Sequence, residues 1–325
     1  MNILFIILAI LITLLLVNIA IGIYFYNFVF NRVWMENGAK KIREELNNDK
    51  SPEGIEKFLK QKKYDDNRDE FNDSVKYIEE QVFIKGYDNT NIHARLIDNN
   101  NKDNIWIVGV HGYRNSSNTF GEFINPLLKK GYNILLPDLR GCGLSKEKYL
   151  TMGNKDKYDV KSWIDYLTEK YPTSKIVIYG VSMGGATTMM TTGLKLSKNV
   201  ICVVEDCGYS SLYDELKYEI NYFLKLPAFP ALNLADLIYR FKNKGVSFKD
   251  VSSVEALKKN EIPILFIHGK NDDFVPYFML QKVYNANKGY KERIEFDYTW
   301  HAEACMKHTD EYYNSINDFI KRFSK

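Results

Sequence analysis

Residues 175–196 read KIVIYGVSMGGATTMMTTGLKL, and this stretch decides the fold. It opens with a short apolar run that predicts a buried strand, and it ends with a pattern that predicts a helix. Between them lies the motif G-x-S-x-G, with Ser182 at its centre. Gly180 and Gly184 lack the side chains that would clash in a sharp turn, so the turn can hold Ser182 in a strained conformation. The Ser182 hydroxyl then stands at a helix N-terminus, where backbone N–H groups favour a developing negative charge.

From residue 75 onward, short apolar runs alternate with helical patterns. The first two segments predict an antiparallel pair of strands, 75–85 and 92–97. The later runs predict buried strands at 105–110, 133–136, 175–179, 200–204, 263–267 and 294–298. Helical spacing recurs over 120–128, 160–167 and 312–323, and Gly131 supplies a helix stop. This alternation predicts an α/β fold with a mostly parallel sheet covered on both faces, in which ligands bind at the carboxyl ends of the strands.

A serine hydroxyl is a weak nucleophile unless a base activates it. Of the five histidines, His301 follows the last predicted strand and precedes the final helix, which places it best for that role. His111 and His268 each end a strand before a glycine and are expected to shape loops through backbone bonds. His93 and His308 are expected at surface or packing positions.

The base needs a carboxylate that orients its other ring nitrogen. The loop after the strand at 263–267 offers Asp272 and Asp273, and we favour Asp272, with Asp206 as a more distant candidate. An oxyanion also needs two N–H donors. Met183 directly follows the serine, and Tyr113 lies in the loop after the strand at 105–110.

Arg114, next to Tyr113, has two interpretations. It either binds an anionic part of a substrate or is an exposed loop arginine.

Four stretches together resemble the α/β-hydrolase superfamily: VHGY at 110–113, PDLRGCGLS at 137–145, GVSMGG at 180–185 and HGKNDDFVP at 268–276. Over roughly 75–325 the chain is similar to bacterial proline-iminopeptidase-like, monoacylglycerol-lipase-like and cinnamoyl-esterase-like serine hydrolases. The resemblance implies that Asp272, four residues after His268, is the acid, and that Asp138 and Arg140 are structural. It also implies a cap over the site at about 211–253. This insertion is rich in apolar and aromatic residues, namely Tyr213, Leu216, Tyr218, Ile220, Tyr222, Phe223, Leu224 and Leu226.

The N-terminal segment is apolar, with no Asp, Glu, Lys or Arg between residues 2 and 31. A helix over 3–30 spans about 42 Å, whereas a bilayer core needs about 30 Å. We expect a retained transmembrane anchor at 1–31, because a cleavable signal peptide would carry a basic start, a shorter apolar run and a small-residue cleavage site. Cations after the span favour a cytoplasmic catalytic domain. Residues 32–74 are expected to form one or two solvated helices that link the anchor to the domain at 75–325.

The composition argues against several classes of protein. Lys plus Arg number 44 and Asp plus Glu 41, a net charge of +3, which argues against a nucleic-acid binder. The four cysteines form no C-x-x-C pair, so we expect no metal site and no disulfide framework.

The sequence therefore predicts a membrane-anchored serine hydrolase, without metal or organic cofactor, that cleaves small-molecule or lipid-like carboxylic esters through an acyl-enzyme. A serine aminopeptidase or amidase on the same triad is the alternative, since Glu205, Asp206, Asp214 or Glu215 could hold a substrate amine. A third hypothesis is a membrane-tethered scaffold protein without catalytic activity.

Overall fold

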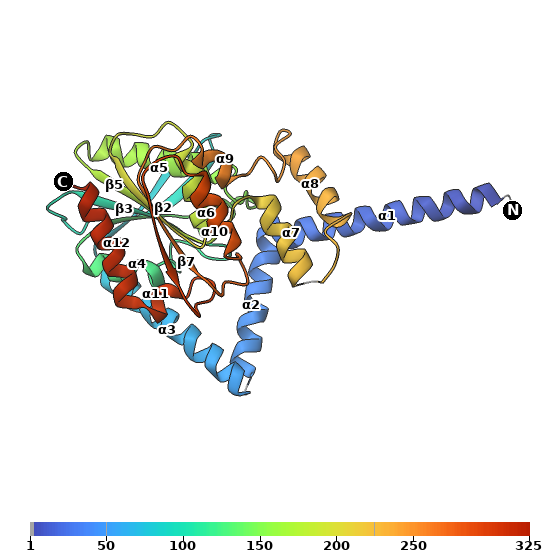
Figure 1. The fold of residues 1–325 in the computed structure, drawn as a ribbon, viewed down its shortest axis with the longest axis horizontal. Helices are drawn as coiled ribbons and strands as arrows, with labels where there is room; N and C mark the ends of the chain where they lie inside the picture. The colour runs from blue at the N-terminus through green and yellow to red at the C-terminus, as the bar shows by residue number, and fades with distance from the viewer. Residues whose placement is uncertain (1–2, 50, 224) are drawn as a thin grey trace.

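The computed structural model describes residues 3–49, 51–223 and 225–325. Its centre is an eight-stranded sheet in the order β1-β2-β4-β3-β5-β6-β7-β8 (Figure 1). Strand β2 pairs antiparallel with β1 and β4, and every other pair is parallel. The strands are β1 Glu79–Lys85, β2 Asn91–Ile97, β3 Ile105–Val110, β4 Asn133–Pro137, β5 Lys175–Val181, β6 Val200–Asp206, β7 Ile264–Gly269 and β8 Lys291–Phe296. The predicted fold class is confirmed.

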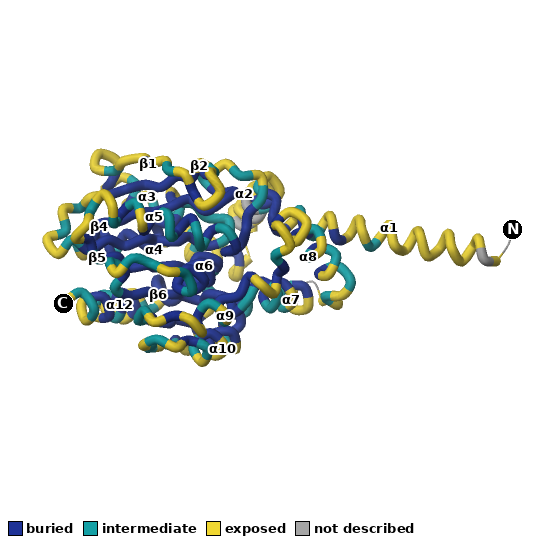
Figure 2. Tube along the Cα trace, turned by 90° about the horizontal axis from the view of Figure 1, so that it is seen from above, coloured by how far each residue is buried: buried dark blue, intermediate teal, exposed yellow. Residues whose placement is uncertain are grey.

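Period-two alternation divides the buried side chains of the strands between two cores. In β3, Trp106 and Val108 face one core, whereas Ile105 and Ile107 face the other. Helices α5, α6, α9 and α10 cover the first face, and α3, α4, α11 and α12 cover the second (Figures 1 and 2). The sheet is thus buried on both sides, as a parallel sheet requires.

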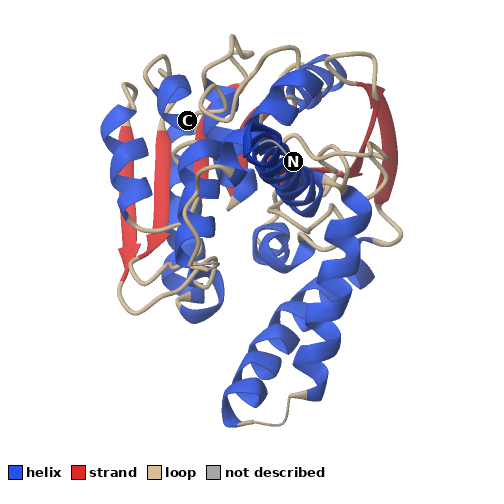
Figure 3. Cartoon of the chain, turned by 90° about the vertical axis from the view of Figure 1, so that its right-hand side faces the viewer, coloured by secondary structure: helices blue, strands red, loops and turns tan. Residues whose placement is uncertain are grey.

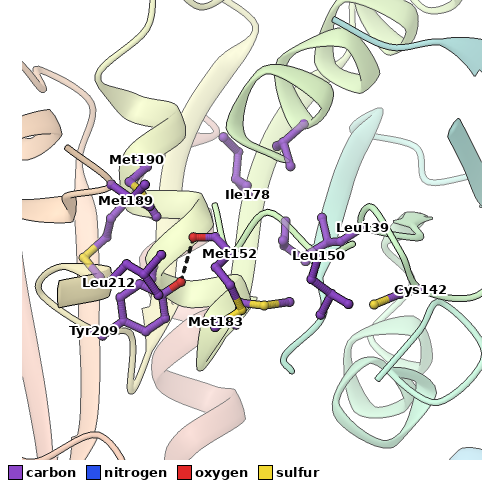
Figure 4. Close-up of a cluster of buried hydrophobic side chains, with 14 of the residues drawn as sticks. Leu139, Cys142, Leu150, Met152, Ile178, Met183, Met189, Met190, Tyr209 and Leu212 are labelled. Atoms are coloured by element: carbon purple, nitrogen blue, oxygen red, sulfur yellow. Dashed lines mark hydrogen bonds between the residues drawn. The ribbon is translucent and has the colours of Figure 1, made fainter. Parts of the chain in front are cut away.

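The helices are α1 Ile3–Phe30, α2 Arg32–Asn48, α3 Pro52–Val75, α4 Gly121–Lys129, α5 Asp156–Lys170, α6 Met183–Thr192, α7 Leu212–Tyr222, α8 Ala231–Lys242, α9 Ser253–Leu257, α10 Phe278–Ala286, α11 Ala304–Lys307 and α12 Thr309–Phe323. Gly131 ends the α4 region with φ +91°, as its sequence position predicts. The first core is rich in sulfur around α6, where Met183, Met189 and Met190 pack near Met152 (Figure 4). Tyr209 Oη donates to the Met152 carbonyl at 2.9 Å and closes this cluster.

Two predicted strand positions were wrong. The opening strand begins at Glu79, because residues up to Val75 belong to α3 and a turn follows. The last strand is Lys291–Phe296, and Tyr298 lies in a turn with φ +51°. Strand β8 is an edge strand in which four of the six residues are charged, so its apolar signal is weak.

The cap consists of α7 and α8 between β6 and β7. Leu224, one of the residues assigned to it, lies outside the described residues, as do residues 1, 2 and 50 of the N-terminal segments. Helix α8 packs against the last turns of α1, where a Cβ on Gly22 would lie 2.5 Å from Leu234 Cβ. The Phe30 ring packs on Tyr239 and Phe248, with ring centroids 5.2 and 5.6 Å away. The end of the apolar helix is therefore part of the packed protein (Figure 2).

Helices α2 and α3 form the hairpin that projects at the lower right of Figure 3. One or two solvated helices were expected here; the structure has two, and they are not simply solvated. Phe71 and Val75 of α3 are fully buried, and the Phe71 ring lies over Gly121 at the start of α4. Helix α3 thus covers the sheet as an integral layer, since its apolar residues find a partner in α4.

The substitution Phe71→Ala should lower the free energy of unfolding by about 3–5 kcal/mol, because it removes a buried ring and leaves a cavity. Lys62→Ala, on an exposed position of the same helix, should change it by less than about 0.5 kcal/mol. Urea unfolding of the full chain in detergent micelles measures both. Equal stability of the two variants would contradict the docking of α3.

Candidate active site

Ser182 lies in the sharp turn between β5 and α6. Its backbone has φ 58° and ψ −121°, a strained conformation for a residue with a side chain. The turn closes only because glycines flank it: a Cβ on Gly180 would lie 2.3 Å from Gly184 O, and one on Gly184 would lie 1.9 Å from Val110 O. The Ser182 N–H donates to the Asp206 carbonyl at 2.8 Å. This geometry projects the hydroxyl at the carboxyl end of the sheet.

Three side chains that are distant in sequence meet at this hydroxyl. His301 Nε2 lies 2.8 Å from Ser182 Oγ, and His301 Nδ1 lies 2.8 Å from Asp272 Oδ2. The remaining oxygen of Asp272 accepts the N–H groups of Phe274 and Val275 at 3.0 and 2.8 Å. Serine, imidazole and carboxylate therefore form one hydrogen-bonded line, the arrangement that activates a hydroxyl nucleophile.

The Asp272 carboxylate is kept ionised by its neighbours. Burial raises its pKa, but the His301 and His268 imidazoles outweigh burial and lower the pKa to about 2. His268 Nε2 contacts the Val275 carbonyl at 2.8 Å and lies 3.4 Å from Asp272 Oδ2. His268 shapes its loop through the backbone, as predicted, and it also faces the carboxylate.

The other candidate carboxylates lie elsewhere. Asp273 lines a neighbouring cavity that His301 also lines. Asp206 is fully buried and accepts a hydrogen bond from Tyr312 Oη at 2.7 Å. Burial raises the pKa of Asp206 to about 6. The geometry thus brings Asp272, rather than either alternative, to the imidazole.

The loop after β3 passes directly over the serine. A Cβ on Gly112 would lie 3.5 Å from Ser182 Cβ, so Tyr113 directly follows a loop residue that is close to the serine. Met183 opens α6, and first-turn N–H groups of a helix have no intrahelical acceptor. His111 holds this loop, because its Nε2 accepts the Leu139 N–H at 3.0 Å and its Nδ1 faces the Gly112 carbonyl at 2.8 Å. Burial lowers the pKa of His111.

The loop after β4 is held by the two residues expected to be structural. Asp138 accepts the Ser117 and Leu144 N–H groups, both at 2.7 Å, and pairs with His93 Nδ1 at 2.7 Å. Arg140 Nε donates to Asp159 at 2.6 Å. His93 is buried rather than exposed and takes the packing role.

Part of the chain matches a known protein family. Residues 105–229 match the α/β-hydrolase-fold family. The chain is 26% identical over 264 residues to YqkD of Bacillus subtilis, which covers 80% of this chain and 85% of that protein. It superposes on the Pyrococcus furiosus esterase Pf2001 with TM-score 0.62 and 26% identity, over 78% of this chain and 96% of the esterase. The chain belongs to the α/β-hydrolase superfamily.

A second solved structure shares the fold. The acylaminoacyl peptidase of Pyrococcus horikoshii superposes with TM-score 0.57 and 19% identity, over 75% of this chain and 41% of the peptidase.

In this α/β hydrolase, a cavity of about 670 Å³ opens beside Ser182 and His301. One wall is the loop after β3, and the opposite wall is the α2–α3 hairpin, with Lys40, Arg43, Lys60, Gln61, Tyr64 and Arg68. The sequence predicted no functional role for these helices. The reason is that a charge-rich helix has the same residue pattern whether it is exposed to solvent or lines a cavity. The spacing of Tyr64, Phe71 and Val75 was the available signal for a docked face.

Helix α3 also braces the loop that carries His301. Tyr64 Oη donates to the Ala302 carbonyl at 2.9 Å, and Lys63 Nζ donates to the Met306 carbonyl at 2.7 Å. Lys60 forms an ion pair with Glu303. The imidazole is therefore positioned from the N-terminal part of the chain.

Two acidic side chains of α7 lie close enough to the Asp272 carboxylate to interact with it electrostatically. Glu215 is 3% exposed, and Glu215 Oε2 and Glu219 Oε1 are both buried without a hydrogen-bond partner among the described residues. They lie one turn apart, on the same side of the helix. Burial, reinforced by Asp272, raises the pKa of Glu219 to about 8, and burial with Glu219 raises that of Glu215. Glu219 was not anticipated from the sequence. Asp214 instead accepts from Ser210 Oγ and pairs with Lys282, at 2.8 and 2.9 Å.

A metal ion would compete with the hydrogen bonds that join Ser182, His301 and Asp272. Within the described residues, Cys207, Asp272 and His301 place ligand atoms within 4.8 Å of one another. Burial raises the pKa of the Cys207 thiol, whereas a metal ligand must be a thiolate. Occupation would also break the Asp272–His301 hydrogen bond. The donor set therefore fits hydrogen bonding better than metal binding.

Glu205, at the end of β6, allows a test of how burial changes the pKa of acidic side chains near the site. Its Oε1 is buried without a hydrogen-bond partner among the described residues, its Oε2 accepts the Gly208 N–H at 3.0 Å, and burial raises its pKa to about 8. Between pH 4.5 and 8 the folded protein keeps this proton while the unfolded chain loses it. The contribution of Glu205 to stability should therefore fall by up to about 1.4 kcal/mol per pH unit over that range.

Glu205→Gln should flatten this decline and raise the unfolding free energy at pH 8. Glu169→Gln, at an exposed position, should leave the decline unchanged. Urea unfolding of each chain between pH 5 and 8 measures the slope. A slope that is the same in the Glu205→Gln variant and the parent would refute the assignment.

Proposed function

We propose that this α/β hydrolase is a serine hydrolase that cleaves carboxylic esters through an acyl-enzyme. The observation that carries the proposal is the hydrogen-bonded line from Ser182 through His301 to Asp272, at 2.8 Å for each link. A line of this kind both activates the hydroxyl and stores its proton. The esterase Pf2001, similar over most of both chains, supports the ester as substrate class.

The reaction begins when Ser182 Oγ attacks the ester carbonyl carbon and its proton passes to His301 Nε2. The ionised Asp272 stabilises the imidazolium that forms. Collapse of the tetrahedral intermediate breaks the bond to the alcohol oxygen, which leaves with the proton from His301. Water then attacks the acyl-enzyme with His301 as base, and the acid and free Ser182 are released.

The oxyanion of each tetrahedral intermediate is held, in this proposal, by the N–H groups of Tyr113 and Met183. Both belong to elements fixed before substrate arrives: Tyr113 to the loop held by His111, and Met183 to the first turn of α6. Preorganised donors of this kind contribute about 3–4 kcal/mol each to the transition state.

An amidase or aminopeptidase is the second candidate, and one observation favours it. Glu215 and Glu219 present unpartnered oxygens beside the triad, and a protonated substrate amine would satisfy them. Comparing kcat/KM for p-nitrophenyl esters and aminoacyl anilides separates the two candidates. Faster turnover of the anilides would replace the ester assignment.

We also propose that α1 anchors the protein in a membrane. The span Phe5–Phe30 is apolar, and an 18-residue stretch within it is only 6% buried. Residues 3–21 have no buried position among those described and extend over about 28 Å as a helix, close to a bilayer core of about 30 Å. The side chains of Tyr26, Val29 and Phe30 pack into the domain. Cleavage of this segment as a signal sequence would therefore remove part of the domain's buried core. Arg32, Lys40, Lys41 and Arg43 after the span favour a cytoplasmic domain.

Ser182→Ala should abolish labelling by a fluorophosphonate probe and ester hydrolysis. Asp272→Asn should lower kcat by about 10⁴-fold, because the imidazole loses its orientation and tautomer. Ser162→Ala, a serine on α5 remote from the site, should label like the parent. In-gel fluorescence and ester kinetics measure these effects. An unlabelled parent chain in its folded state would favour the non-catalytic scaffold.

Deletion of residues 3–21 should release the protein from the carbonate-washed membrane fraction, while the parent stays bound. The intact mass of the parent purified from that fraction should include α1. A mature chain that starts after residue 31 would instead identify a signal sequence. A reporter fused after Lys325 should be active only in the cytoplasm, and activity only outside would reverse the orientation.

A further inference from the structure

The charged lining of the cavity beside Ser182 is strongly unbalanced. Among the described residues that line it, five are cationic and one, Glu122, carries a carboxyl group. The cations come from three different elements: Lys40 and Arg43 from α2, Lys60 and Arg68 from α3, and Arg114 from the loop after β3.

Most of these cations have an ion-pair partner. Arg43 and Arg68 share Asp65, and Lys60 pairs with Glu303. Arg114 differs: among the described residues it forms no ion pair, and its Nε is buried without a hydrogen-bond partner. Its guanidinium lies 5.3 Å from the Tyr113 ring centroid. A buried donor without an acceptor is costly, so a bound acceptor would be favoured there.

The nearby carboxyl groups offset this positive charge only weakly. Glu122 is 9% exposed, and burial raises its pKa to about 7. Glu219 faces Arg114 from α7, and burial raises its pKa to about 8, although Arg114 opposes the rise. Near neutral pH both groups therefore carry less negative charge than ordinary glutamates, and the cavity stays cationic.

Arg114 is also close to the reacting centre along the chain. It directly follows Tyr113, and its φ of +65° turns the backbone at this point. Its side chain reaches toward α2, where its Nη2 would lie 3.9 Å from a Cβ on Gly38. The arginine thus bridges the oxyanion loop and the hairpin, inside the cavity that contains Ser182.

We propose that this cavity selects esters that carry a carboxylate or phosphate group, held by Arg114 with help from the cations of the α2–α3 hairpin. The inference rests on the proposed serine hydrolase function and narrows its substrate class. Arg is suited to the task because its planar guanidinium donates two parallel hydrogen bonds to either anion.

Three pairs of esters, each matched except for charge, test this selectivity. 4-Nitrophenyl hemiglutarate against 4-nitrophenyl valerate places the anion on the acyl side. 1-Butyrylglycerol 3-phosphate against 1-butyrylglycerol places it on the alcohol side. The third pair is 1-oleoylglycerol 3-phosphate against 1-oleoylglycerol, both in mixed micelles. It tests whether the anionic group that the cavity selects belongs to a lipid headgroup rather than to a soluble ester.

In the full-length protein, kcat/KM for the anionic ester divided by that for its neutral partner is the readout. We expect Arg114→Gln to lower this ratio by about tenfold or more in at least one pair, Arg43→Gln to lower it less, and Arg114→Lys to retain part of it. Arg322→Gln removes an exposed arginine on α12 and should leave the ratio unchanged. The ratio cancels any general loss of catalysis caused by altering the oxyanion loop.

Ratios within twofold of the parent for both Arg114→Gln and Arg43→Gln, in all three pairs, would overturn the inference while leaving the hydrolase assignment intact. If the parent turns over no ester and takes no fluorophosphonate, the hydrolase proposal fails instead. In that case, binding of 1-oleoylglycerol 3-phosphate against 1-oleoylglycerol to the Ser182→Ala protein decides the anion site by itself. Equal affinity for the two lipids would refute it.

Discussion

The close approach of β5 to α6 is the constraint on which the site depends. The space at Gly184 is so narrow that a Cβ would lie 1.9 Å from the carbonyl oxygen of Val110, on the neighbouring strand. Only glycines allow the chain to turn here, and the turn forces Ser182 to φ 58°. Because β3, β5 and β6 are hydrogen-bonded neighbours, the hydroxyl has a fixed position relative to the loops that follow each of them.

Buried polar groups hold those loops through the backbone. His111 accepts from the loop after β4, His268 faces the Val275 carbonyl, and Asp138 accepts two backbone N–H groups. Reactive side chains on loops keep their geometry when a rigid scaffold fixes the loop ends. The loop of His301 obtains its support differently, from Tyr64 and Lys63 on α3.

The N-terminal helices therefore do more than connect an apolar segment to a domain. Tyr113 Oη donates to the Val29 carbonyl at 2.8 Å, which joins α1 directly to the loop over Ser182. Helix α8 of the cap packs on the same end of α1. The apolar helix, the cap and the hairpin thus surround one site, with a cationic wall from α2 and α3 and buried acids from α7.

The α/β class, the turn at Ser182 and the order serine, aspartate, histidine along the chain could all be predicted from the amino-acid sequence. These features follow from local patterns: a period of two in strands, a helical period, and glycines where backbone crowds. Tertiary structure alone decided which helices face the cavity, where Glu219 lies and what supports the loop of His301. Tyr64 and Ala302 are 238 residues apart in sequence. A charge-rich helix carries no local signal of such a partner, because docked and solvated faces differ only in what folds against them.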